Sequence, residues 1–271
     1  MGRVAGPFLH KPFPLFQISP INVIEKKHSD NFRFLHNLSF PYNGDSINDN
    51  IGQEEKTVHY SNIGDAIKMI LHHGNVPFLS KTDIVDAFRL IPIRPIDYPK
   101  LGIKFNGLFY YDKVLPQGCG SSCRIFSAFS AAIKHIHLSL SPSLSTVHLL
   151  DDFLFVSHTE TQNLFAQNLF KDICSFIGIP LSAKKTTLPS TVCTFLGVEL
   201  DTHNRCARLP QEKLLFYTEE IRSILHKSYI TKRDMQSIIG KLSFAASIVP
   251  GRPFLRRLID STMGLDNLTS R

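Results

Sequence analysis

Two adjacent acids, Asp151 and Asp152, interrupt a stretch that otherwise has the composition of buried strands. The stretch is TVHLLDDFLFVS, residues 146–157, and its flanks are rich in Leu, Phe and Val, as is typical of a largely buried sheet. Two crowded carboxylates repel each other, which raises the cost of ionising both unless a cation offsets it. The simpler interpretation is an exposed polar turn, although tight hairpins favour Asn-Gly or Asp-Gly. A third carboxylate nearby would favour a metal site.

The segment KTDIVDAFRL, residues 81–90, supplies that carboxylate in Asp83, with Asp86 three residues later. At a sheet edge beside the Asp151-Asp152 hairpin, such side chains could bind two divalent cations through oxygen atoms. Two ions roughly 3.5–4 Å apart stabilise the attacking and leaving oxygens of phosphoryl transfer. A predicted ribbon and helix separate the two acidic segments, which is the arrangement needed to bring distant strands into one sheet.

Composition bounds the protein class only loosely. The chain has 271 residues, enough for a real core, and 30 Lys and Arg against 23 Asp and Glu give a formal charge of +7. This moderate excess favours a polyanionic partner. The five cysteines form no C-x-x-C pair, so we expect reduced thiols and an intracellular location, with cytoplasm and nucleus both open. No stretch approaches roughly 20 apolar residues, so no membrane association is expected.

The predicted elements follow one another in a mixed order. A basic hairpin (18–40) precedes a helix that begins at Ser61 or Asn62 and ends at Gly74. Asn106-Gly107 is a strong signal for the bend of a two-stranded ribbon. The full series of later predictions comprises a strand and turn at 78–93, the ribbon at 101–118, a helix at 121–140, the acidic hairpin, a helix at 160–178, and strands at 186–188 and 193–200.

Strand, helix, strand pair, helix, strand is the order of a split βαβ sheet. Apolar periodicity predicts the buried faces of its two helices, which comprise Ile125, Phe129, Ala132, Ile133 and Ile136 in the first, and Leu164, Leu169, Ile173, Phe176 and Ile177 in the second. Two amphipathic helices at 211–227 and 231–249 follow, and Thr231 with Asp234 predicts a capping box. We favour a packed helical lobe there over a helix-turn-helix DNA reader, because nothing marks a base-reading face.

These blocks, in this order, resemble the reverse transcriptases of retroelements and retroviruses. The resemblance runs from about Ser19 to about Leu258, and the segment GKLSFAASIVPGRPFLRRL, residues 240–258, is most similar to DIRS-like retrotransposons. It implies an α+β fold, the right-hand polymerase with fingers, palm and partial thumb and a split βαβ palm sheet.

The resemblance also implies a division of the chain. The fingers are expected at 1–79, with 95–118 returning to them, the palm at 80–205 and a helical thumb-like lobe at 206–271. No acidic cluster of the ribonuclease H type follows, so no RNase H domain is expected in this chain, and RNase H or other retroelement domains would be missing from it.

In that family, palm carboxylates hold two metal ions, which assigns the catalytic metal-binding role to Asp83, Asp151 and Asp152. The expected cofactor is Mg²⁺, as two ions, with Mn²⁺ as an alternative. The segment LSAKKTTLP resembles the block whose lysine protonates the pyrophosphate, and Lys185 is preferred to Lys184 for that role.

Further roles concern the nucleotide and the primer. Lys26 and Arg33 resemble the fingertip cations that neutralise the triphosphate, although such a hairpin alone is usually a solvated surface. The other residues carried over are Asp86 and Ala87 (backbone at the triphosphate), Phe88 (sugar selection), Gln117 and Gly118 (nucleotide support), and Phe195, Leu196 and Gly197 (primer grip). Phe88 is equally compatible with an ordinary core aromatic.

The sequence departs from the family pattern at two positions, and it is compatible with three functions. Leu149 stands where the family usually has an aromatic residue, and Cys123 stands where a proline is common. The main hypothesis is an RNA-directed DNA polymerase that acts on an RNA or DNA template with its primer and deoxynucleoside triphosphates. The alternatives are a truncated or host-retained remnant that binds nucleic acid without catalysis, and an RNA-templated RNA polymerase, which Phe88 disfavours.

Overall fold

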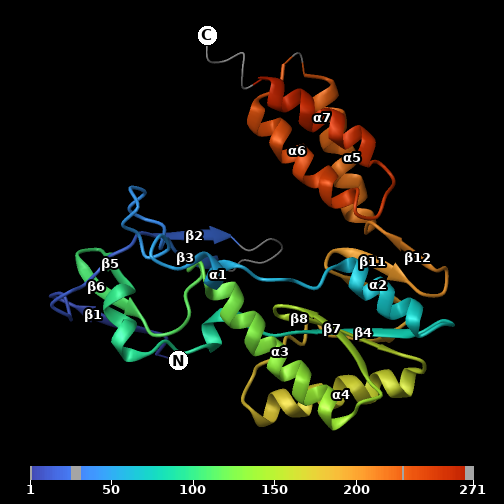
Figure 1. Ribbon diagram of the computed structural model, residues 1–271, viewed down its shortest axis with the longest axis horizontal. Coiled ribbons are helices and arrows are strands. Elements are labelled where there is room, and N and C mark those ends of the chain that lie inside the picture. Colours follow the sequence, from blue (N-terminus) through green and yellow to red (C-terminus); the bar gives the residue numbers. More distant parts are fainter. Residues whose placement is uncertain (1, 26–31, 228, 266–271) are drawn as a thin grey trace.

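Helices and antiparallel sheets alternate along the computed structural model, which describes residues 2–25, 32–227 and 229–265 (Figure 1). The predicted α+β class and the order strand, helix, strand pair, helix, strand are confirmed. The elements of that series are β4 (Phe78–Asp83), α3 (Ser122–Leu140), β7 (Ser145–Leu149), β8 (Asp152–Ser157), α4 (Glu160–Phe176) and β9 (Thr187–Ser190). They build a four-stranded antiparallel sheet with the order β7-β8-β4-β9.

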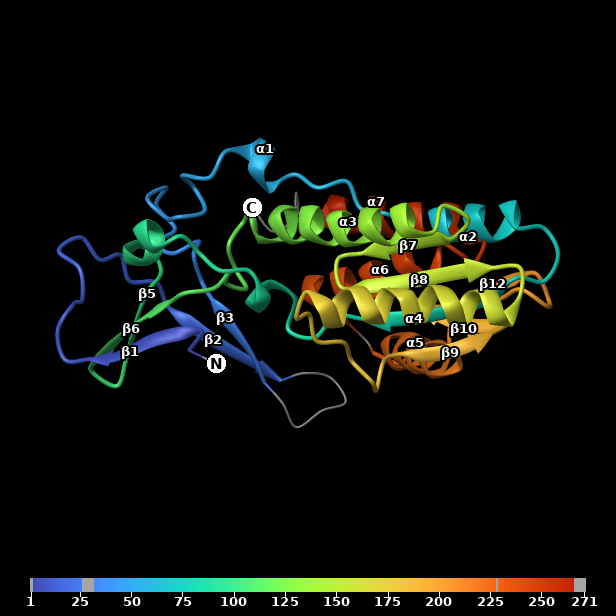
Figure 2. The ribbon, with the colours of Figure 1, turned by 90° about the horizontal axis from the view of Figure 1, so that it is seen from below.

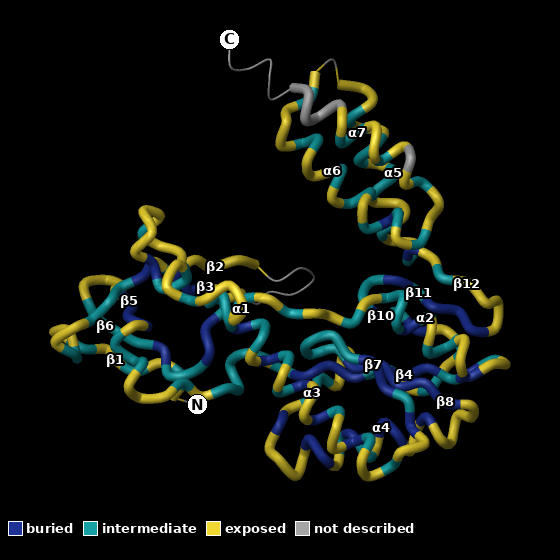
Figure 3. Tube along the Cα trace, in the orientation of Figure 1, coloured by how far each residue is buried: buried dark blue, intermediate teal, exposed yellow. Residues whose placement is uncertain are grey.

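Strand β8 lies inside this sheet and is buried on both faces. Because successive side chains alternate between faces, Phe153 and Phe155 point to one core, and Leu154 and Val156 point to the other. The dark segments of Figure 3 run along β4 and β8 for this reason. The inner strands are thus fixed from two sides.

Helices α3 and α4 cover one face of the sheet (Figure 2). Their predicted buried faces were partly wrong. Ile125 and Ile136 are exposed, and Phe176 is 92% exposed. The buried positions are instead Ser122, Phe126, Ser130, Ile133 and His137 in α3, and Asn163, Ala166, Gln167, Phe170, Ile173 and Cys174 in α4.

Polar residues can occupy these faces because they bond to backbone carbonyls. Asn163 Nδ2 donates to the carbonyl oxygens of Phe78 and Phe155 at 2.8 and 3.1 Å. Gln167 Nε2 donates to Thr187 O at 2.7 Å. These hydrogen bonds offset the cost of burying the two amide NH2 groups and join α4 to three strands, while Asn163 Oδ1 has no hydrogen-bond partner among the described residues.

The opposite face of the sheet is covered by α2 (Ile63–His72) and by a second sheet. Asn62 is the N-cap of α2, in a capping box with Asp65. The second sheet has the order β10-β11-β12, with bounds Val192–Phe195, Val198–Asp201 and Cys206–Arg208. The segment 193–200 was predicted as one strand but forms a hairpin, because Leu196 and Gly197 both adopt positive φ, 48° and 74°, at its turn.

The N-terminal part forms a separate group of strands. Its sheet has the order β1-β6-β5, and a two-stranded ribbon pairs β2 with β3. The Asn106-Gly107 bend is confirmed between β5 and β6. The bounds are β1 (Val4–Phe8), β2 (Ile21–Glu25), β3 (Phe32–His36), β5 (Gly102–Phe105), β6 (Leu108–Asp112), α1 (Gln53–Lys56), and the 3₁₀ turns η1 (Ala87–Leu90) and η2 (Pro95–Lys100).

Three helices form the C-terminal lobe, which stands apart from the sheet in Figure 1. They are α5 (Gln211–Leu225), α6 (Lys232–Ala245) and α7 (Arg252–Leu265). The capping box of Thr231 and Asp234 is confirmed at α6, while α7 was not predicted as a helix. None of the helices in the described ranges is both long and apolar enough to cross a bilayer.

Candidate active site

The acidic hairpin begins with an unusual backbone conformation. Strands β7 and β8 pair up to Leu149 opposite Asp152, so Leu150 and Asp151 form the two-residue turn. Leu150 has φ of 52°, in the region where a non-glycine residue is strained. The carbonyl oxygen of Asp151 accepts a hydrogen bond from Ile84 N at 2.9 Å, which joins this turn to the end of β4.

The register brings the predicted carboxylates together. Asp83 and Asp152 lie directly opposite each other on β4 and β8. Like charges at such a pair of positions destabilise a sheet, since the Cβ atoms are roughly 5 Å apart. Asp83 is almost fully buried, and Asp151 and Asp152 are half-buried. Three acids therefore lie together at one poorly solvated end of the two inner strands.

Burial and repulsion disfavour their ionised forms. Burial is the main reason that the pKa of Asp151 rises to about 6, and repulsion from Asp83 and then Asp152 adds to the shift. Burial also raises the pKa of Asp152, although attraction to Lys81 opposes this shift. The site therefore carries negative charge that the protein compensates incompletely.

Lys185 supplies part of the compensation. Its Nζ donates to Asp83 Oδ2 at 2.7 Å. Burial alone would lower the pKa of Lys185, but the hydrogen bond to Asp83 and the attraction of all three acids raise it above its ordinary value. The ammonium group thus stands beside Asp83 with its proton firmly held.

The donor set suits a hard divalent ion, because it consists of carboxylate oxygens around a site of excess negative charge. Within residues 2–25, 32–227 and 229–265, however, no three His, Cys, Asp or Glu side chains are already arranged around a common ion position. Lys185 occupies one oxygen of Asp83. An ion that used Asp83 Oδ2 would have to share this oxygen with the ammonium group or displace it.

The turn after Asp83 presents the residues predicted to meet the nucleotide. Asp86 adopts φ of 61° and receives a hydrogen bond from Arg3 Nη1 at 2.7 Å, so its carboxylate is engaged away from Asp83. Ala87 and Phe88 begin η1. The half-buried Phe88 ring contacts the Phe126 ring edge to face, with centroids 5.4 Å apart. Phe88 is therefore a partner of the core as well as a candidate for sugar selection.

The loop at Gln117 and Gly118 is tightly held. The carbonyl oxygen of Gln117 accepts from His36 N at 2.8 Å. Gly118 has φ of 123°, and a Cβ there would lie 2.1 Å from His36 O, so only glycine fits. Among the described residues, Gln117 Oε1 is a buried acceptor without a hydrogen-bond partner.

The remaining candidates are less closely joined to the carboxylates. Arg33 is exposed on β3, opposite Ile24, and Lys26 lies outside the described residues. Phe195 is fully buried in the core, so a primer contact in this segment would come from the β10-β11 turn, where Gly197 O accepts from Lys213 Nζ at 3.1 Å. The primer-grip assignment stays a prediction.

Several contributing residues were missed from sequence. Lys81 is one, and its charge attracts Asp152. Side chains two positions apart in a strand share a face, so the spacing of Lys81 and Asp83 could have identified it. Arg3 is another, and no local pattern links it to Asp86, which is 83 positions away in the sequence. The strain at Leu150 also has no signature in a Leu-Leu-Asp-Asp sequence.

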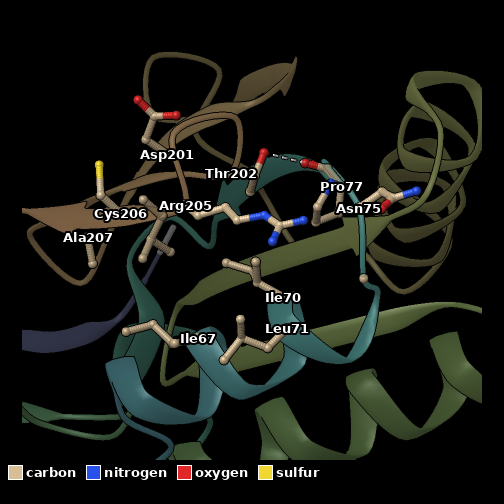
Figure 4. Close-up of a pocket in the computed structure, with 12 residues that line it drawn as sticks. Ile67, Ile70, Leu71, Asn75, Pro77, Asp201, Thr202, Arg205, Cys206 and Ala207 are labelled. Carbon is tan, nitrogen blue, oxygen red and sulfur yellow. Dashed lines mark hydrogen bonds between the residues drawn. The ribbon is translucent and has the colours of Figure 1, made fainter.

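A separate pocket of about 260 Å³ lies between α2 and the β11-β12 connection (Figure 4). Ile67 and Ile70 of α2 line one side, and Thr202 donates to Pro77 O at 2.8 Å on the other. Pro77 precedes β4 and Asp83 ends it, so roughly 20 Å of strand separates this pocket from the carboxylates. It is not part of the acidic site.

Comparison with known proteins identifies the class. The family described as reverse transcriptase (RNA-dependent DNA polymerase) matches residues 24–200. The chain therefore belongs to the reverse transcriptase family, a class of nucleotidyltransferases.

Sequence relatives are viral polyproteins. The Gag-Pro-Pol polyprotein of Human T-cell leukemia virus 2 is 26% identical over 193 residues, which cover 69% of this chain and 12% of that protein. The putative enzymatic polyprotein of Cassava vein mosaic virus is 25% identical over 229 residues, or 84% of this chain and 32% of that protein. The chain thus spans a minor part of these relatives.

Solved structures support the fold. The foamy viral protease-reverse transcriptase in complex with dsDNA has a TM-score of 0.66 at 20% identity, covering 98% of this chain and 54% of that chain. The same viral protein in complex with an RNA/DNA hybrid has a TM-score of 0.63 at 20% identity, covering 90% of this chain and 29% of that chain. The predicted right-hand polymerase fold class is therefore confirmed.

Proposed function

We propose that this chain is the polymerase part of a retrotransposon reverse transcriptase. The primer 3′-oxygen forms a bond to the α-phosphorus of a deoxynucleoside triphosphate, and the bond to the β-phosphate breaks to release pyrophosphate. The observation that carries the proposal is the convergence of Asp83, Asp151, Asp152 and Lys185 at one sheet edge. The partners are an RNA or DNA template with its primer, since solved relatives are in complex with dsDNA and with an RNA/DNA hybrid.

Each residue has a role that follows from its surroundings. Asp83, Asp151 and Asp152 would hold two Mg²⁺ ions, or Mn²⁺ as an alternative, which when bound supply positive charge at the attacking and leaving oxygens. Lys185 keeps a proton at Nζ beside the carboxylates and can donate it to the departing pyrophosphate. Phe88 excludes a ribose 2′-hydroxyl through the bulk of its ring.

Primer extension tests the proposal. The wild-type chain is compared with Asp151→Asn on a primed RNA template with deoxynucleotides and Mg²⁺. Asp97→Asn is a matched control, because Asp97 pairs only with Arg94 and Lys100 at the surface of η2 among the described ion pairs. Extension by the wild type and the control, lost in Asp151→Asn, is the expected result.

One observation favours the alternative of nucleic-acid binding without catalysis. Lys185 already pairs with Asp83, so one of the three carboxylates is compensated without a metal ion. A wild-type chain that binds primer-template but adds no nucleotide with Mg²⁺ or Mn²⁺ would support this alternative and contradict the polymerase proposal.

A further inference from the structure

A buried ionic cluster lies behind the candidate nucleotide site. Asp112, at the end of β6, is fully buried. Its Oδ1 accepts a hydrogen bond from Arg89 Nη2 at 2.6 Å, and its Oδ2 lies 3.4 Å from His36 Nδ1. His36 is also fully buried, and its Nε2 lies 3.2 Å from Gly102 O, an acceptor, so Nε2 carries a hydrogen. The Asp112 carboxylate therefore bonds β6 to η1 and lies against His36 at the end of β3.

Arg89 and His36 each belong to a segment assigned to the incoming nucleotide. Arg89 follows Phe88 directly in η1. His36 ends β3, and its backbone contacts both residues of the Gln117-Gly118 loop, through the 2.8 Å hydrogen bond to Gln117 O and through close packing of its carbonyl against Gly118. A shift of Asp112 would thus move both walls of the nucleotide site.

Stability alone does not account for the cluster. Buried ion pairs lose solvation, and apolar residues of similar volume are often at least as stable in their place. Here three buried polar atoms, His36 Nδ1, Asp112 Oδ2 and Arg89 Nη1, have no hydrogen-bond partner within the described part of the chain. A cluster with incomplete hydrogen bonding is a costly way to fill a core, which points to a role in function.

We propose that Asp112, Arg89 and His36 are positioning residues that fix the spacing between the Phe88 ring and the Gln117-Gly118 loop. None of the three touches the nucleotide. Through this spacing they determine how tightly a deoxynucleoside triphosphate binds and how strongly a ribonucleotide is rejected. The inference rests on the proposed polymerase function and extends it to groups outside the acidic site.

The test measures nucleotide binding separately from turnover. Asp112→Asn keeps the shape of the side chain and removes its charge, and Asp97→Asn is the surface control. For Asp112→Asn we expect the KM for deoxynucleotides to rise roughly tenfold with kcat nearly unchanged, because ground-state and transition-state binding are lost together. Discrimination against ribonucleotides should fall. A merely structural role would lower the active fraction, and hence kcat, equally for both substrates.

A double variant, Arg89→Met with Asp112→Leu, keeps the test decisive if Asp112→Asn fails to fold. Recovered thermal stability with a KM that stays high supports positioning by the charges, whereas a KM that recovers with stability overturns it. A second measurement is independent of catalysis. A primer with a dideoxy end is held on its template, and stabilisation of the complex by the next deoxynucleotide is recorded for each variant.

The two readouts separate the two proposals. If the wild type adds no nucleotide, the polymerase proposal fails, but loss of the nucleotide-stabilised complex in Asp112→Asn still supports the cluster. Equal stabilisation in wild type and Asp112→Asn, or none in the wild type, overturns the cluster as a positioning device.

Discussion

Replacement of Asp151 by Asn is expected to stabilise the protein while it removes activity. The pKa of Asp151 rises from an ordinary 3.8 to about 6 in the folded protein. Each unit corresponds to ~1.4 kcal/mol, so ionised Asp151 costs the folded state roughly 3 kcal/mol. Partial exposure of the carboxylate reduces the gain from Asn to about 1.5–3 kcal/mol at neutral pH.

The sign of the effect depends on pH. Between about pH 4 and pH 6 the folded state binds the proton of Asp151 more tightly than the unfolded chain does, so wild-type stability falls as pH rises through this window. Asn has no proton to lose and escapes this fall. The advantage of Asp151→Asn is therefore complete above the folded pKa and absent below about pH 4.

Urea unfolding at several pH values, with a chelator present, measures this difference in the free energy of unfolding. In a thermal melt at neutral pH, the melting temperature of Asp151→Asn should be higher by roughly 3–5 °C. The control Asp97→Asn should show no gain, because a hydrogen bond from Lys100 is the main cause that lowers the pKa of Asp97. The reasoning would be refuted if Asp151→Asn were no more stable than the wild type at neutral pH. It would also be refuted if the stability advantage of Asp151→Asn were as large below about pH 4 as at neutral pH.

Divalent ions should stabilise the wild type relative to Asp151→Asn. An ion that binds only the folded state stabilises it by ~2.7 kcal/mol at one hundred times its dissociation constant. Mg²⁺ is therefore expected to raise the melting temperature of the wild type and to have little effect on Asp151→Asn. Equal shifts in both proteins would contradict a metal site at this carboxylate.

Three further outcomes are expected. Phe88→Ala should admit ribonucleotides in single-nucleotide incorporation, and unchanged discrimination would remove this ring as the selecting group. Gly118→Ala should lower the free energy of unfolding by roughly 3 kcal/mol or more, because the alanine Cβ would clash with the His36 carbonyl and φ is positive. An unchanged urea midpoint would show that the loop can move. Phe170→Ala should cost about 3–5 kcal/mol and Phe176→Ala less than about 0.5, since only Phe170 is buried, and similar urea midpoints would place the wrong face of α4 in the core.

Local signals predicted the parts of the fold that short segments decide. The Asn106-Gly107 bend and the Thr231-Asp234 capping box are confirmed, because positive φ and a free helix N-terminus need particular residues wherever they occur. The order of the sheet elements followed from strand and helix periods. Asp83 and the Asp151-Asp152 pair could be singled out because charge within an apolar strand pattern requires a reason.

Packing between distant segments decided what the sequence could not show. Periodicity assigned Phe176 to the core, but Asn163 and Gln167 are buried instead, because sheet carbonyls satisfy their amides. Such a bond depends on strands far away in the chain, so no helical pattern reveals it.

The sequence by itself determined which chemistry this chain can perform, because the number and type of carboxylates and lysines are fixed by composition and local pattern. Only the tertiary structure decided that Asp83 stands opposite Asp152, that Lys185 bonds to Asp83, and that Asp112 bonds to Arg89. The physical reason is that electrostatic energy depends on distance and burial, which arise when segments separated by up to about a hundred residues pack together.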